Sequence, residues 1–189
     1  MIRIFFMLAV FALACVATAL FLGIRVGDLH AILDRETLPE LREMTIERAS
    51  MHRQAGLVAA IVVIFANSIS VTYFIGTSRW CKEVVERYSL DAALLGRSIA
   101  LKRRTFPWAV SSMLVVVGVA TLGAAADPGT GLPNTADWVL PHFLAALAAM
   151  AFLGFSFFVQ AANIRAHYGV IGDIMAEVRK AREARGLAV

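Results

Sequence analysis

The chain has 189 residues, of which 59% are hydrophobic and only 17% charged, and its mean hydropathy is +0.72. Soluble domains are about 45–50% apolar and about 25% charged, so this composition argues against a soluble globular protein. The net charge of +4 is small and gives no reason to expect a nucleic-acid partner, and two cysteines are too few for a disulfide framework.

Four apolar stretches follow one another along the chain, at residues 4–24, 55–75, 107–126 and 138–160. Each is close to the ~20 residues that a helix needs to cross a bilayer, and none contains Asp, Glu, Lys or Arg. Backbone groups in lipid must bond within their own segment, so these stretches are expected to be α-helices. The sequence predicts an all-α integral membrane protein with four transmembrane helices, forming a single domain over residues 1–189.

The segment at residues 25–53 is predicted to be a helical extension on the outer side. Pro39 suits the first turn of a helix, and neither Pro nor Gly follows it until Gly56. The second helix is therefore expected to begin near Leu38 and to extend about four turns beyond the bilayer. An acidic stripe and three apolar side chains of this extension are candidate partner contacts; they are Glu36, Glu40, Glu43, Glu47, Leu38, Leu41 and Met44. The alternative for the acidic stripe is a solvated helix face.

Residues 77–105 are predicted to form a cytoplasmic helical hairpin that lies against the bilayer or beneath the bundle. Glycine and small polar residues at 76–78 are a candidate break, and residues 89–91 are the turn between the two helices. Pro107 is expected to open the third span. Three residues on one face of the hairpin are candidate contacts for a partner: Trp80, Val84 and Tyr88.

The tail at residues 163–189 is predicted to be a basic amphipathic helix on the cytoplasmic side. Its apolar residues step by four, three, four and three, which predicts docking onto the inner hairpin or a partner helix. The stripe consists of Ile164, Tyr168, Ile171, Met175 and Val178, and we expect Tyr168, Ile171 and Met175 to make contacts with a partner.

The basic residues predict the orientation. Of the 18 Lys and Arg residues, 13 precede the first span, lie between the second and third, or follow the fourth; the first loop has the other five and the third loop none. The positive-inside rule then places both termini and the middle loop in the cytoplasm, in a multi-pass protein of the cell (inner) membrane.

Histidine offers the sharpest chemical hypothesis. His52 precedes the second span and His142 lies about one turn inside the fourth, so both are expected at the outer face on helices that run in the same direction. Two such histidines can ligate a haem b iron. The layout is similar, in architecture alone, to haem-carrying anchor subunits of quinone-linked respiratory complexes. The alternatives are a smaller metal shared with Glu47 or Asp137, and interfacial histidines that bond water, headgroups or a loop.

Polar residues without charge occur at the inner ends of the second and fourth spans, where they are expected to bond helix to helix. A quinone headgroup or polar-substrate site is the alternative. The residues are Asn67, Ser68, Ser70, Thr72, Ser156, Gln160 and Asn163. Ion-coupled transporters normally place ionisable groups at mid-membrane, and these spans contain no Asp, Glu, Lys or Arg, which argues against such a transporter.

No phosphate loop, dinucleotide fingerprint, zinc-protease motif or serine-hydrolase motif is present, so no catalytic activity of its own is expected. The first expectation is a non-catalytic integral subunit that anchors, bridges or stabilises a larger membrane complex. Its partners would be the bilayer and other subunits, or a second copy of the chain. The second expectation is a haem b-binding, quinone-linked electron-transfer anchor that uses His52 and His142. A small transporter or channel ranks third. Apart from haem b, no cofactor is expected.

Overall fold

The computed structural model describes residues 1–30 and 38–186, and within these ranges the chain is helical with no strand. The elements are α1 (Ile2–Ile24), α2 (Pro39–Tyr88), α3 (Ala92–Ala126), the short 3₁₀ turns η2 (Pro128–Thr130) and η3 (Thr135–Trp138), and α4 (Val139–Glu183). Four helices are long and apolar enough to cross a membrane. The all-α class and the four apolar helices predicted from the sequence are confirmed.

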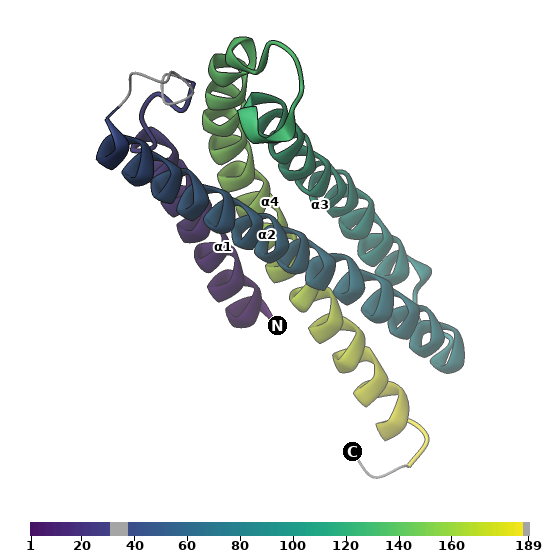
Figure 1. Cartoon of the computed structure of the whole chain (residues 1–189). Coiled ribbons are helices and arrows are strands. Elements are labelled where there is room, and N and C mark those ends of the chain that lie inside the picture. Colours follow the sequence, from purple (N-terminus) through teal and green to yellow (C-terminus); the bar gives the residue numbers. More distant parts are fainter. Residues whose placement is uncertain (31–37, 187–189) are drawn as a thin grey trace.

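The four helices form an up-down-up-down bundle (Figure 1). α1 and α3 each pack against both α2 and α4, and α2 also contacts α4 across the bundle. α2 and α4 therefore run in the same direction on one diagonal, with α1 and α3 on the other. We call the end at which α1 joins α2 and α3 joins α4 the loop end of the bundle.

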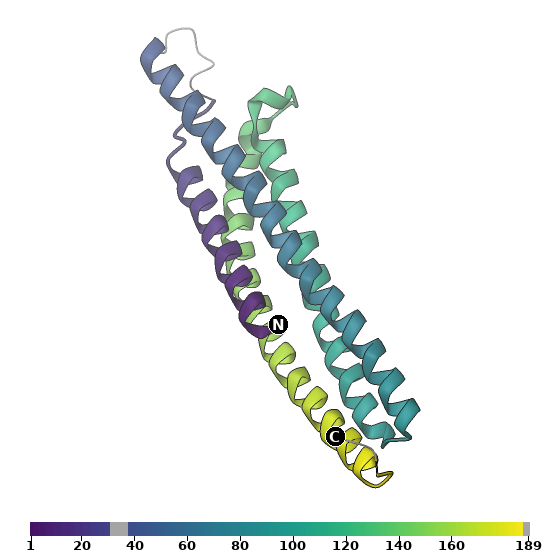
Figure 2. The same ribbon diagram turned by 90° about the horizontal axis from the view of Figure 1, so that it is seen from below.

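The helices differ in length, and this gives the bundle a second, narrower part. At 1.5 Å per residue, the 23 residues of α1 extend about 35 Å, whereas the 50 residues of α2 extend about 75 Å. A hydrocarbon core is about 30 Å thick, so α1 is matched to it while α2 is much longer. α2, α3 and α4 continue past the N-terminus of α1 (Figure 2), and we call this region the three-helix end.

Small side chains let α1 lie close to its neighbours in the apolar part of the bundle. Ala9 and Ala12 on α1 are buried in one core with Val63 and Ala66 on α2. Close approach of small residues favours helix association in membranes, where apolar burial alone offers no driving force. Aromatic contacts add to this core, as in the edge-to-face pair of Phe5 with a ring of α4 whose centroid lies 6.1 Å away.

Residues 77–105 do not form the separate hairpin expected from the sequence. They are the last turns of α2 and the first turns of α3, which pack side by side with α4. The small residues at 76–78 do not interrupt α2, and the last of them, Ser78, is buried against the neighbouring helices. The predicted turn is present: Ser89 is left-handed at φ 54°, and Asp91 caps α3 by accepting a hydrogen bond from Ala93 N at 2.8 Å. Pro107 lies inside α3 and does not start it.

A hydrophobic core holds the three-helix end together within this chain. Trp80, Val84, Tyr88 and Ile171, expected to contact a partner, pack against it. Its buried members are Cys81, Val85, Val170, Ile174 and Val178. The residues that were predicted as a hairpin and the residues that were predicted as a tail therefore pack on each other through their apolar faces.

The tail continues α4 without a break up to Glu183, and its buried face differs from the predicted stripe. Tyr168 is 72% exposed and Met175 is 49% exposed, whereas His167 and Ile174 are fully buried. Ile164 and Val178 are buried as predicted, but between them the buried face consists of His167, Val170 and Ile174, each one residue before the predicted member of the stripe. Tyr168 and Met175 stay available for a partner, which remains a prediction.

Replacing Ile174 by alanine should loosen the three-helix end. Ile174 is fully buried in its core, and large-to-small changes at such sites cost about 2–5 kcal/mol. Hydrogen exchange read by mass spectrometry should show faster exchange in the last turns of α4. The neighbouring change Met175→Ala is the control and should have little effect; equal protection in both variants would contradict internal packing of this region.

Candidate functional site

Two histidines meet inside the bundle near the loop end. His52 lies on α2 and His142 in the first turns of α4, the two helices of one diagonal. Their ring centroids are 6.1 Å apart and the ring planes are inclined by 66°. The structure therefore brings together the two residues that the sequence singled out, on helices with the same direction.

Each histidine ring lies against a glycine of a neighbouring helix. A Cβ added at Gly23 of α1 would lie 2.9 Å from Cε1 of His52, and one added at Gly123 of α3 would lie 3.0 Å from Cε1 of His142. Real Cβ atoms essentially never show the first distance, and the second is tighter than nine in ten real Cβ contacts. From α1 to α4, the helices thus contribute Gly23, His52, Gly123 and His142 in turn. The sequence reasoning missed both glycines, since a single glycine near a helix end is an ordinary feature.

Hydrogen bonding fixes the tautomer of His52. Its Nδ1 lies 2.9 Å from the carbonyl oxygen of Ala19, which can only accept, so Nδ1 carries the proton and Nε2 keeps a lone pair. Histidines that bind metals almost always donate their other ring N–H in this way. In His142 the Nδ1 atom is buried and has no hydrogen-bond partner among the described residues. Each ring thus offers a nitrogen that the protein leaves unused.

The donor set fits haem better than a small metal ion. The described residues contain no group of three or more His, Cys, Asp or Glu side chains that could hold a metal. Glu47 and Asp137, the carboxylates considered from the sequence, are exposed and join no such group. A haem iron needs only axial ligands from the protein. The edge of each ring that carries Cε1 and the two nitrogens lies against Gly23 of α1 or Gly123 of α3. To hold one haem iron between them, both rings would therefore have to turn toward each other.

Polar contacts close the loop end beside the histidines. Arg53, next to His52, forms an ion pair of 3.0 Å with Asp127 at the end of α3. The ring of His30, in the segment after α1, lies 3.0 Å from the hydroxyl of Thr135 in η3. These two contacts join the α1–α2 and α3–α4 connections, and so they help to hold α2 and α4 in register at the histidine pair.

The acidic stripe lies on the part of α2 farthest from the bundle. Glu40, Glu43 and Glu47 are exposed on this helix, and Glu36 lies outside the described residues. Leu38, Leu41 and Met44 are exposed as well. The predicted extension of the second helix is therefore present from Pro39 onward, and residues 25–30 form turns that are not helical.

Four of the seven uncharged polar residues make the expected bonds between helices, namely Asn67, Ser156, Gln160 and Asn163. Ser68 bonds to a carbonyl of its own helix instead. Gln160 donates to Asn67 at 2.9 Å and to Ser156 at 3.1 Å, and Ser156 lies 2.7 Å from Ser112 on α3. Asn163 of α4 likewise donates to a threonine of α3. Two polar atoms of this region, Gln160 Oε1 and Ser70 Oγ, are buried without a partner in the described part of the chain.

A second network surrounds the buried His167. Its Nδ1 lies 3.1 Å from the hydroxyl of Tyr73, and its Nε2 lies 2.8 Å from the hydroxyl of Ser98, which is 3.2 Å from that of Ser78. Both ring nitrogens are occupied, so His167 is not available as a metal ligand. α3 supplies one polar partner to His167 and two to the network described before it. These residues were not predicted from the sequence, although they recur every seven residues, at Ser98, Thr105 and Ser112.

Replacing Ser98 by alanine should destabilise the bundle, because it leaves Nε2 of the fully buried His167 without a partner. An unsatisfied buried polar group costs about 1–3 kcal/mol. Thermal unfolding in mild detergent, followed by circular dichroism, should show a lowered midpoint. The control is Ser111→Ala on the same helix, for which the structure shows no hydrogen bond across helices. Equal midpoints would mean that the His167 network contributes little.

Comparisons with protein-family models, with curated proteins and with solved structures found no match to this chain.

Proposed function

We propose that this chain is an integral membrane electron-transfer subunit that holds one haem b between His52 and His142. One observation carries the proposal: at one level of the bundle, two histidine rings with centroids 6.1 Å apart lie on one diagonal and two glycines lie on the other. Axial imidazole ligation supplies a redox centre without any catalytic residue. The absence of known hydrolase, phosphate-binding and zinc-protease motifs from the sequence is compatible with such a role.

The proposed orientation places the haem site near the outer face of the cell (inner) membrane. It follows from the distribution of Lys and Arg, which favours a cytoplasmic location for both termini and for the three-helix end. The exposed carboxylates of Glu40, Glu43 and Glu47 would then lie on the same side as the haem. Carboxylates in that position would attract a basic soluble electron carrier and raise its rate of encounter.

The test is a reduced-minus-oxidised visible spectrum of the full chain, purified in mild detergent from cells that make haem. We expect the narrow bands of a six-coordinate, low-spin b-type haem at one haem per chain. A chain of full helical content that is purified from haem-replete membranes without such bands would contradict the proposal.

A second candidate is a subunit without haem that anchors or bridges a larger membrane complex. It is favoured by apolar side chains exposed beyond the apolar spans, above all Leu38 and Tyr168, which are 71% and 72% exposed. Purification of the tagged chain from its native membrane, read by mass spectrometry, should recover partners at constant ratio. Recovery of the chain alone would count against this role. The small transporter or channel has least support, because the apolar spans contain no Asp, Glu, Lys or Arg.

A further inference from the structure

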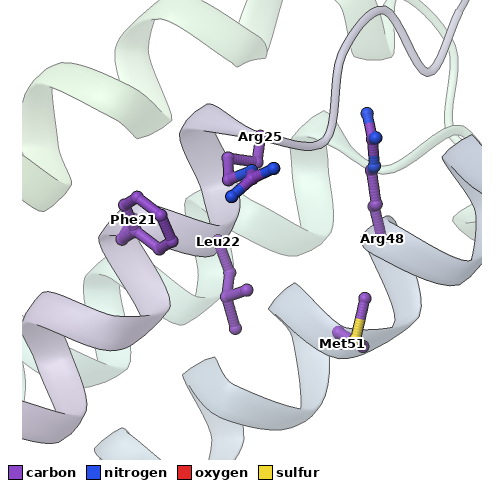
Figure 3. A pocket seen from close by; sticks show the side chains of 5 residues that line it. All are labelled: Phe21, Leu22, Arg25, Arg48 and Met51. Atoms are coloured by element: carbon purple, nitrogen blue, oxygen red, sulfur yellow. The ribbon is translucent and has the colours of Figure 1, made fainter.

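A small pocket opens between the end of α1 and the neighbouring turns of α2, apart from the histidine pair. Its volume is about 190 Å³, and its lining joins two basic side chains to three apolar ones (Figure 3). The lining residues are Phe21, Leu22, Arg25, Arg48 and Met51. The pocket thus has a cationic part and an apolar part within one opening.

The two arginines have no acidic partner within residues 1–30 and 38–186. Among the described residues, no carboxylate forms an ion pair with Arg25 or Arg48, although five other ion pairs are present. The guanidinium of Arg25 instead lies 5.5 Å from the centre of the Phe21 ring, in a cation–π contact. Two unpaired guanidinium groups at one pocket present a planar set of N–H donors that suits a phosphate.

The position of the pocket indicates where such a phosphate comes from. α1 ends at Ile24, which is also where its apolar run ends, so Arg25 lies at the depth of lipid headgroups. Phe21 and Met51 are exposed on the outer surface of the bundle, where acyl chains would cover them. A soluble anion would gain the arginines but not the apolar surface, whereas a phospholipid would gain both.

We propose that this pocket binds an anionic phospholipid, with Arg25 and Arg48 holding its phosphate and with Phe21, Leu22 and Met51 contacting its glycerol and acyl chains. The proposal is independent of haem binding. It also explains why two arginines lie together on the side of the protein that has fewer basic residues. A lipid held there would fasten the end of α1 to α2 close to Gly23, which packs against His52.

Native mass spectrometry of the full chain in detergent, titrated with phosphatidylglycerol, tests the proposal. Arg25→Gln combined with Arg48→Gln should weaken phosphatidylglycerol binding at least about tenfold, because charge-assisted hydrogen bonds are lost. The matched control is Arg3→Gln combined with Arg87→Gln, which removes the same charge from exposed sites at the opposite ends of the same two helices. This control should bind phosphatidylglycerol like the unchanged chain.

A second variant separates the pocket from its charge. Met51→Trp keeps both arginines and fills the apolar part of the pocket, so it should also weaken phosphatidylglycerol binding. Full lipid binding by this variant, or equal losses in the test and control pairs, would overturn the proposal. Efficient competition by inorganic phosphate would overturn it as well, since it would indicate a site for a soluble anion. Circular dichroism should show the same helical content in every variant.

Discussion

Alanine in place of His142 is expected to abolish the low-spin haem spectrum of the purified chain. The remaining ligand, His52, cannot complete the axial coordination of the iron alone. Loss of a group that merely orients a metal-binding histidine already costs about 10- to 100-fold in affinity, and loss of the ligand itself should cost at least as much. Haem content per chain, from the reduced-minus-oxidised spectrum, is the measurement.

The other histidines supply controls for this result. His52→Ala should have the same effect as His142→Ala, because the two rings lie side by side on one diagonal, with centroids 6.1 Å apart. His30→Ala removes an imidazole that contacts the buried Thr135 and does not belong to the histidine pair. The ion pair of Arg53 with Asp127 would still join the two connections, so the bands should stay in place. Unchanged bands in His142→Ala would contradict the assignment of this residue as an axial ligand.

The membrane-spanning part of the fold could be predicted from the sequence because the bilayer imposes a simple rule. Stretches without charge that are close to ~20 residues in length have to be helices there. α1 ends at Ile24, as the first apolar run does. The caps followed from local chemistry: Pro39 begins α2 and Asp91 caps α3, each as expected from its residue type.

The regions beyond the apolar spans were harder to predict, because the same rule stops there. Gly76 and Pro107 are residues that commonly interrupt helices, yet α2 and α3 run through them. Proline removes one backbone donor and glycine adds backbone freedom, but packing against the other helices offsets both costs. A local sequence pattern carries no information on packing between distant segments. A separate hairpin and tail were therefore predicted where the structure has three continuous helices.

The candidate site was predictable only in part, for a related reason. His52 and His142 stand out by residue type, and helix direction was enough to predict that they lie at the same end of the bundle. The close approach of Gly23 and Gly123 depends on the rotation of α1 and α3 about their axes. Weakly amphipathic helices do not encode that rotation in their hydrophobic pattern, because lipid and core are equally apolar.

Alanine in place of Gly123 provides the strictest test of the site's shape, because in an ordinary helix this change is favourable. Alanine stabilises a helix interior by about 0.5–1 kcal/mol relative to glycine. Gly118→Ala on the same helix, where a new Cβ meets nothing within 4 Å, should therefore raise the melting temperature and leave haem content unchanged. At Gly123 the new Cβ would lie 3.0 Å from the His142 ring.

Overpacking of this kind typically costs about 1–3 kcal/mol, which corresponds to a loss of haem affinity of roughly 5- to 150-fold. Haem titration of the two purified apo-variants, each followed by its visible spectrum, is the measurement. A selective loss of haem affinity in Gly123→Ala, with helical content retained, would tie the glycine to the cofactor. Equal haem affinities in the two variants would mean that the glycine only accommodates the His142 ring. The alternation of glycine and histidine would then be a packing device, and the chain's role would have to be sought in its membrane partners.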